Sequence, residues 1–135
     1  MEEELIIYTD GGSRGNPGPA GFGVAVYAKD GRPLASFDKF IGVTTNNQAE
    51  YQAVVFALEK AKEMGAKRLS FFLDSELVVR QLNGEYKVKN KDLAPLFLKI
   101  HNLKISFSSV TFTHVRREFN KEADRLANIA MDRGR

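Results

Sequence analysis

The sequence predicts an α/β domain in which helices cover the faces of a mixed β-sheet. Two patterns support this class: strand patterns joined by turns in the first third of the chain, and helical periods alternating with strands after it. The composition agrees, because 43% apolar and 27% charged residues suffice for a hydrophobic core. At 135 residues the chain has the size of one domain, so we predict a single domain over residues 1–135.

Three strand patterns open the chain. Residues 5–9 read LIIYT, and a glycine-rich turn at 11–19 is expected to stop this strand at the aspartate in between. A second strand is predicted at 21–28, and a Lys-Asp-Gly turn at 29–31 joins it to a third at 34–41. Because short turns join these patterns, we expect an antiparallel meander.

From residue 44 the hydrophobic period becomes that of a helix. Apolar residues share one face over 44–64, and Gly65 is suited to end the helix. The remaining predicted elements are a strand at 69–73, helices at 75–83 and 93–103, a strand at 110–115 and a helix at 120–133. Strands connected through helices favour parallel pairing, so we expect three antiparallel strands followed by two parallel ones.

Composition also limits the chemistry. The chain has no cysteine and only two histidines, His101 and His114, which excludes thiolate sites and disfavours zinc. We interpret His101, in the middle of a predicted helix, as structural. Any bound metal is expected to be a hard cation held by oxygen atoms. The acidic N-terminus and the lack of a long apolar run predict a cytoplasmic protein without a membrane segment.

Charge is distributed unevenly along the chain. Residues 1–79 hold 8 basic and 11 acidic residues, a balance of −3, whereas residues 80–135 hold 12 and 6, a balance of +6. This asymmetry favours a polyanionic partner that contacts mainly the C-terminal half. A solvated basic surface without a partner is the alternative interpretation.

Asp10 and Asp74 each follow a predicted strand. Ligand sites of open α/β sheets lie beyond the carboxyl ends of strands, so both carboxylates would share one crevice if the first and fourth strands are parallel neighbours. Simpler interpretations stay open: Asp10 precedes two glycines and suits a turn, and Asp74 precedes Ser-Glu-Leu and suits a helix cap.

Glu50 and Asp124 lie on the apolar faces of predicted helices. Glu50 is in line with Val54 and Leu58, and Asp124 shares a face with Ala127. An unpaired buried carboxylate is costly, which favours a cation or hydrogen bonds as its partner. Either acid could instead be a tolerated residue at the edge of the core, and the neighbouring Arg125 offers Asp124 a surface partner.

Four acids on four different elements favour one metal site. Clustered carboxylates repel each other, and two divalent ions about 3.5–4 Å apart are a known means of neutralising them and of cleaving a phosphodiester. A carboxylate pair that shares a proton, as in glycoside hydrolysis, is the alternative. It accounts poorly for the basic C-terminal half of the chain.

These acids stand in motifs that resemble the ribonuclease H family, in particular its type 1 branch. The motifs are YTDGGSRGNPG at 8–18, TTNNQAEY at 44–51, DSELV at 74–78 and NKEADRLA at 120–127. They occur in the family's order and spacing and span most of the chain. The resemblance implies a ribonuclease H-like fold, with a five-stranded mixed sheet flanked by helices, that forms a single ribonuclease H catalytic domain.

The resemblance also implies roles for individual residues. Catalytic residues and metal ligands would be Asp10, Glu50, Asp74 and Asp124, which would hold two Mg²⁺ ions in the presence of substrate, with Mn²⁺ as a substitute. Positions that contact an RNA–DNA hybrid correspond to Asn16, Asn46 and Asn47. Their amides suit 2′-hydroxyls and base edges, although turn formation by the first and helix capping by the other two would explain them as well.

Two basic segments complete the comparison with the family. The loop after the last predicted strand contains His114 and Arg117, and the resemblance implies that one of them assists the reaction, with the compact archaeal and bacterial branch favouring the arginine. Many bacterial relatives carry a Trp- and Lys-rich protrusion where this chain has only a short connector at 84–91. We expect phosphate contacts from its lysines, Lys87, Lys89 and Lys91, and salt-sensitive binding.

The sequence therefore predicts a monomeric endonuclease that hydrolyses the RNA strand of RNA–DNA hybrids and leaves 5′-phosphate and 3′-hydroxyl ends. Two alternatives stay open: the same fold acting on double-stranded RNA, and a non-catalytic nucleic-acid-binding module. The second would not need four clustered acids, which repel phosphate unless metal neutralises them. A dinucleotide-binding protein is poorly supported, because the glycine-rich segment joins two strands and does not open a helix.

Overall fold

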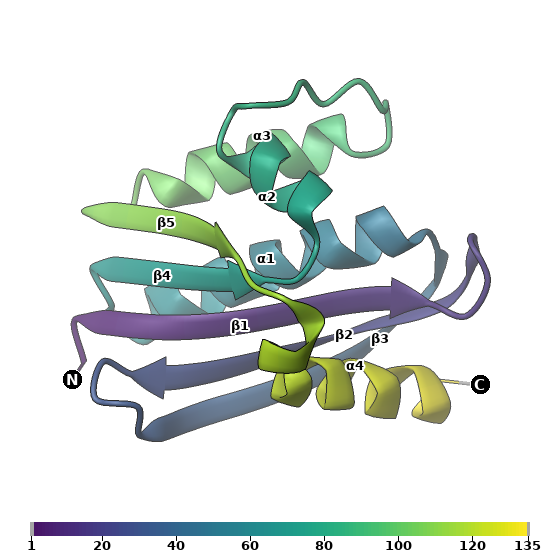
Figure 1. Ribbon diagram of the computed structural model, residues 1–135. Helices are drawn as coiled ribbons and strands as arrows, with labels where there is room; N and C mark the ends of the chain where they lie inside the picture. The colour runs from purple at the N-terminus through teal and green to yellow at the C-terminus, as the bar shows by residue number, and fades with distance from the viewer. Residues whose placement is uncertain (1, 135) are drawn as a thin grey trace.

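A five-stranded mixed sheet in the order β3-β2-β1-β4-β5 forms the centre of the computed structural model, which describes residues 2–134 (Figure 1). The strands are β1 (Glu4–Ser13), β2 (Gly18–Ala28), β3 (Pro33–Thr44), β4 (Arg68–Leu73) and β5 (Ser109–His114). The first three pair antiparallel, and β4 pairs parallel with both β1 and β5. The predicted sheet is thus confirmed; Met1 and Arg135, the ends of the predicted domain, lie outside the described residues.

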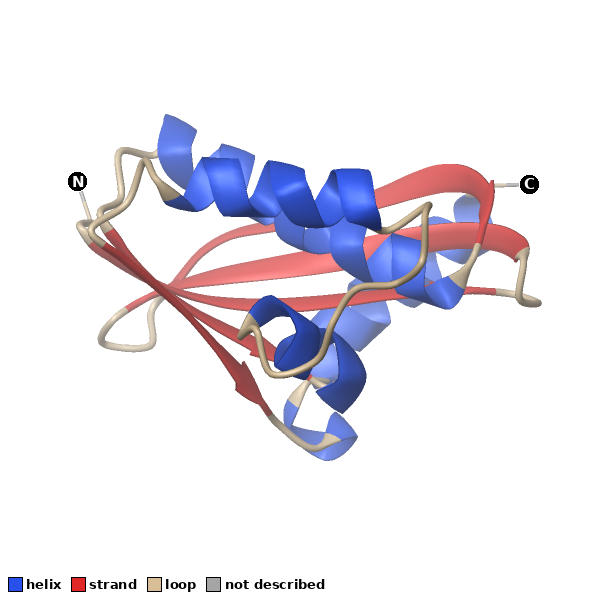
Figure 2. Cartoon of the chain, turned by 90° about the horizontal axis from the view of Figure 1, so that it is seen from above, coloured by secondary structure: helices blue, strands red, loops and turns tan. Residues whose placement is uncertain are grey.

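Helices cover both faces of this sheet. They are α1 (Asn46–Glu63), α2 (Glu76–Leu82), α3 (Ala94–Lys104) and α4 (Lys121–Arg133), and a 3₁₀ turn, η1 (Arg117–Phe119), precedes the last helix. Figure 1 shows α1 behind the sheet and α4 crossing in front of it, and Figure 2 shows the strands fanning out through the twist of the sheet. Within residues 2–134, no helix combines the length and apolar character needed to cross a membrane.

The main core lies between the sheet and α1. Leu5 and Ile7 of β1 are fully buried there with Val54 and Leu58 of α1. Burying each such side chain stabilises the fold by about 1.5–3 kcal/mol relative to exposure. Tyr51 is equally buried, and its hydroxyl donates a 2.7 Å hydrogen bond to Gln81 on α2, so the one helix is tied to the other.

Two helix-cap interpretations that the sequence left open do not hold. Thr45, not Asn46 or Asn47, caps α1, because its side chain accepts a hydrogen bond from the backbone N–H of Gln48. Ser75 caps α2 in the same way, which leaves the carboxylate of Asp74 outside the capping interaction.

The predicted end of the first strand is also wrong. β1 continues through Asp10 to Ser13 and stays paired with β2, from Asp10 opposite Gly23 to Ser13 opposite Ala20. A glycine stands at position 11 because α1 packs closely there: a Cβ on Gly11 would lie 2.4 Å from the backbone of Ala49. The glycine therefore serves close packing in a strand and does not form the turn that the sequence pattern indicated.

Candidate active site

The four predicted acids line one cleft of about 470 Å³ at the end of the sheet where β1 extends past β4. Its lining residues are Asp10, Gly11, Gly12, Ser13, Arg14, Asn46, Asn47, Glu50, Asp74, Ser75, Arg117, Asp124, Asn128 and Met131. They come from β1, the N-terminus of α1, the end of β4, η1 and α4. Two helices on opposite faces of the sheet thus contribute to one site.

The end of β4 explains why Glu50 reaches this cleft. The pairing of β1 with β4 stops at Tyr8 opposite Phe72, so the edge of β1 beyond that point has no neighbouring strand. There the backbone N–H of Gly11 donates to Oε1 of Glu50 instead of to a strand carbonyl. The helix carboxylate therefore occupies the place that a longer β4 would have taken, and it is 5% exposed.

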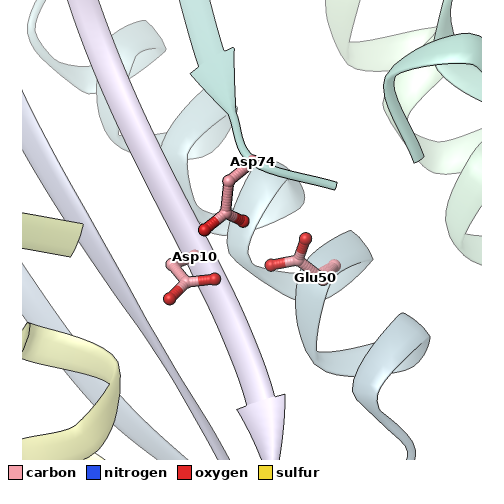
Figure 3. Close-up of side chains that lie close together, drawn as sticks. All are labelled: Asp10, Glu50 and Asp74. Carbon is pink, nitrogen blue, oxygen red and sulfur yellow. The ribbon is translucent and has the colours of Figure 1, made fainter. Parts of the chain in front are cut away.

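Asp10, Glu50 and Asp74 form the centre of the site. Each offers a carboxylate oxygen, and these atoms all lie within 4.8 Å of one another. Figure 3 shows the three side chains converging from β1, from α1 and from the residue that follows β4. Such convergence of carboxylate oxygens, which are hard donors, fits a divalent cation.

Burial and mutual repulsion raise the pKa of all three carboxyls above their ordinary values. For Asp10 burial is the largest cause, followed by the charges of Glu50 and Asp74. For Glu50 burial again comes first and the charge of Asp74 second, while the Gly11 hydrogen bond acts in the opposite direction. For Asp74 burial raises the pKa, and the nearby Asn120 and Arg117 limit that increase. The cluster is therefore unfavourable when ionised unless a cation neutralises it.

Asp124 approaches the same site from α4 under different conditions. Its side chain is 31% exposed, and its Oδ1 lies 3.6 Å from Nη2 of Arg117. It also lies close to Asp10. A hydrogen bond between the two side chains raises the pKa of Asp10 further. The fourth acid is thus adjacent to the other three, but it has a cationic partner within the chain.

Two of the three asparagines, Asn16 and Asn46, hold the turn between β1 and β2 against α1. Oδ1 of Asn46 accepts a 2.8 Å hydrogen bond from the backbone N–H of Ser13, and Oδ1 of Asn16 accepts one of 3.0 Å from that of Asn46. Asn46 and Asn47 line the cleft, whereas Asn16 stands outside the lining. Since these hydrogen bonds use the side-chain oxygens, the amide N–H groups of Asn16 and Asn46 are available as donors.

The remaining predicted site residues lie apart from the acids, except Arg117. His114 ends β5, is exposed and is not among the described residues that line the cleft. Lys87, Lys89 and Lys91 are exposed on the connector between α2 and α3, which Figure 1 places at the opposite side of the molecule from α4. His101, interpreted as structural, is exposed on α3 and has no role in the core.

Two residues near the acids were missed by the sequence interpretation. Asn120 is 1% exposed and donates a 2.9 Å hydrogen bond to the carbonyl of Thr9. A second hydrogen bond, to the side chain of Asp74, lowers the pKa of that carboxyl. Arg14 lines the cleft from the β1–β2 turn. Asn120 stands in the motif around Asp124, which could have indicated it. Arg14 stands in a glycine-rich segment that was interpreted as a turn, and this pattern gave no reason to single out the arginine.

The sheet order and the carboxylate cleft define an α/β domain of the ribonuclease H-like fold, with oxygen ligands that fit a divalent metal ion. Comparison with known proteins agrees. The profile of a family described as "Reverse transcriptase-like" matches residues 8–130. Together with the relatives below, this match shows that the chain belongs to the ribonuclease H family.

Three solved structures illustrate the similarity. The N-terminal RNase H domain of a Mycobacterium tuberculosis protein is 43% identical, with a TM-score of 0.93, over 97% of this chain and 95% of that chain. RNase H1 of Halobacterium salinarum is 41% identical, also with a TM-score of 0.93, over 96% and 98%. An RNase H1 isolated from compost, solved in complex with an RNA/DNA hybrid, is 45% identical with a TM-score of 0.91 over 95% and 96%.

Two of the curated relatives are much longer than this chain. It spans 36% of the bifunctional Mycobacterium tuberculosis protein, to which it is 44% identical. It spans 63% of the Ribonuclease HI of Halobacterium salinarum, at 42% identity. The activity and substrates of those whole proteins are therefore a basis for proposals about this chain.

Proposed function

We propose that this chain is an endonuclease that hydrolyses the RNA strand of RNA–DNA hybrids and leaves 5′-phosphate and 3′-hydroxyl ends. The observation that carries the proposal is the convergence of three carboxylates from β1, α1 and the end of β4, with a fourth beside them on α4. A relative that is 45% identical was solved in complex with an RNA/DNA hybrid. Family membership and site geometry therefore support the same activity.

The metal ligands in this proposal are Asp10, Glu50, Asp74 and Asp124. Asp10 is clustered with Glu50 and Asp74 and lines the same cleft as Asp124, so it would serve both metal positions, with Glu50 and Asp74 holding one ion and Asp124 the other. When bound, Mg²⁺ or Mn²⁺ would activate the attacking water and stabilise the leaving oxygen. The raised pKa values support this set, because cation binding would relieve the repulsion that raises them.

Other residues of the cleft would bind the substrate. Asn46 and Asn47 lie beside the acids, and amide side chains can bond the 2′-hydroxyl that distinguishes RNA from DNA. Arg117 faces the same cleft and would assist by binding phosphate or through its ion pair with Asp124. His114 would assist only from outside the described cleft lining, so we assign the assisting role to Arg117.

Cleavage of an end-labelled RNA–DNA hybrid tests the proposal, with Mg²⁺, with Mn²⁺ and with EDTA. We expect the RNA strand alone to be cut, only when metal is present, and the 5′-phosphate to be identified by end analysis. An RNA duplex of the same sequence tests the alternative substrate. Binding of the hybrid without cutting under every metal condition would contradict the proposal and favour a non-catalytic binding module.

We also propose that the protein is a cytoplasmic monomer of one ribonuclease H domain, as its sequence predicts. The supporting observation is that residues 2–134 build one sheet with its own core. Light scattering coupled to size-exclusion chromatography would measure the mass in solution. A mass of twice 15.1 kDa would show a dimer instead.

A further inference from the structure

Arg14 gives the cleft a second positive charge. Among the described residues that line the cleft, the cations are Arg14, in the turn between β1 and β2, and Arg117, in η1. The four acids lie in the same cleft. A nucleic acid that enters it carries several phosphates, and those that are not at the reacting position meet no metal. The arginines are the groups of the cleft with the charge to bind them.

The guanidinium of Arg14 is held by two residues of α4. Its Nη1 pairs with the carboxylate of Asp132, and its Nη2 donates a 3.2 Å hydrogen bond to Oδ1 of Asn128. These partners are four residues apart and share one face of the helix. Since a guanidinium has five N–H donors, the bonds within the described residues leave donors free for a phosphate.

The backbone around Arg14 is held as well. Its N–H donates a 2.8 Å hydrogen bond to the carbonyl of Pro19, which closes the turn. A Cβ on Gly18 would lie 2.1 Å from the carbonyl oxygen of Arg14, so this close approach requires the glycine. The neighbouring Ser13 is bonded to Asn46 of α1. The side chain is thus presented from a turn that is tied to α1 on one side and to α4 on the other.

The two arginines are spaced along α4. Arg117 pairs with Asp124 and Arg14 with Asp132, and these acids are eight residues apart on the helix. At 1.5 Å per residue, eight residues correspond to about 12 Å. One strand of a duplex rises about 3.4 Å per nucleotide along its axis, so this distance covers roughly three nucleotides. The arginines can therefore contact different phosphates of one strand.

We infer that Arg14 binds a backbone phosphate of the strand that is cut, on the side of the acids away from Arg117, and that Asp132 and Asn128 position its guanidinium. This inference rests on the proposed function. Arg14 is suited to the role because its side chain is 47% exposed and its planar fork matches phosphate oxygens. Its exposed ion pair with Asp132 is weak in water and would not prevent phosphate binding.

Arg14→Gln tests this inference, and Arg133→Gln is a matched control. Arg133 also joins the end of α4 to the sheet through an aspartate, Asp38 of β3, but it does not line the cleft. For a short RNA–DNA hybrid we measure kcat and KM with Mg²⁺, and Kd with Ca²⁺ in place of Mg²⁺, over a range of salt concentrations. Arg14→Gln should raise KM and Kd about tenfold, leave kcat within about threefold, and reduce the salt slope of log Kd by about one. Arg133→Gln should leave all of these unchanged.

Asp132→Asn separates phosphate binding from a purely structural link. It removes the negative charge but keeps an amide oxygen that can still accept the hydrogen bond from Arg14, so the guanidinium stays positioned, Kd should not rise and the salt slope should not fall. If Asp132→Asn or Arg133→Gln reproduces the loss seen in Arg14→Gln, or if Arg14→Gln matches the wild type, the inference is wrong. A wild type that binds hybrid without cutting it would contradict the proposed function alone, because the Kd comparison would still decide the role of Arg14. A wild type that neither binds nor cuts would overturn both.

Discussion

The two walls of the cleft hold their carboxylates in different ways. On the α1 side, Glu50 is 5% exposed, bonded to the backbone of Gly11 and grouped with Asp10 and Asp74. On the α4 side, Asp124 is 31% exposed and has Arg117 beside it. The first wall is more buried and short of positive charge, whereas the second is more open to solvent and partly neutralised by Arg117.

This difference suggests a division of labour within the site. Repulsion among the clustered acids destabilises the fold when they are ionised and is relieved when a cation binds, which makes the α1 side the stronger metal site. An acid that already has an arginine partner gains less from metal and is easier to replace.

Asp10→Asn should abolish cleavage, with kcat lowered by about 10³-fold or more. Asp10 is the acid that contacts both walls, so its loss weakens metal binding on either side. Steady-state cleavage of the hybrid with Mg²⁺ measures the effect, and Kd with Ca²⁺ should stay within a few-fold of the wild type. Turnover retained in this variant would remove Asp10 from the centre of the site.

Asp124→Asn should be milder, with kcat lowered by about 10- to 100-fold, a range typical of supporting groups at metal sites. The physical reason is that Asp124 is half-buried and paired with Arg117, while the three clustered acids remain in place. The same cleavage assay, run at several Mg²⁺ concentrations, checks this. A loss equal to that of Asp10→Asn would show that both walls contribute equally.

Without metal, Asp10→Asn should make the protein more stable. The pKa of Asp10 is higher in the folded protein than in the unfolded chain, where it is about 3.9. Protonated Asp10 therefore contributes its full stability to the fold below about pH 3.9, and this contribution is lost as the pH rises through the folded-state pKa. At pH 8 with EDTA we expect Tm to rise by roughly 3–8 °C, the range for about 1–2 kcal/mol. At pH 3 the difference should vanish.

Calorimetry or circular dichroism measures this difference in Tm, and Asp132→Asn is the control, because Asp132 is an exposed acid outside the cluster. Mg²⁺ should raise the Tm of the wild type and leave that of Asp10→Asn nearly unchanged, since the ion stabilises the protein only where it binds. An equal rise in Tm for both aspartate variants would point to net charge and not to the cluster.

The smallest effect concerns a region far from both walls. Replacing Lys87, Lys89 and Lys91 together by alanine should leave kcat unchanged and weaken hybrid binding by several-fold at low salt. The salt slope of log Kd should fall by as much as about three if each lysine contacts one phosphate. Binding titrations at a series of salt concentrations test this, and a variant with unchanged affinity and slope would show that the connector does not contact the hybrid.

Sequence patterns predicted most elements to within a few residues, because they depend on neighbours along the chain. The helix predicted at 120–133 is observed as Lys121–Arg133, and the strand predicted at 110–115 as Ser109–His114. The first strand failed because glycines were interpreted as turn residues. Only the packing of Ala49 against Gly11 shows that this glycine allows a helix to approach a strand.

The sequence by itself determined which four acids line the cleft. Local periodicity put Glu50 and Asp124 on inward helix faces, strand patterns put Asp10 and Asp74 near strand ends, and the motifs indicated the family. These inferences succeed because they rest on residues within a few positions of each other.

Only the tertiary structure decided which atoms meet. Gly11 and Glu50 are 39 residues apart, Thr9 and Asn120 are 111 apart, and Arg14 and Asp132 are 118 apart. No local pattern contains such pairs, because their distance depends on where β4 stops and on how α1 and α4 pack on opposite faces of the sheet. For the same reason, the separation of His114 from the cleft and the pairing of Arg117 with Asp124 appear only once the chain is folded.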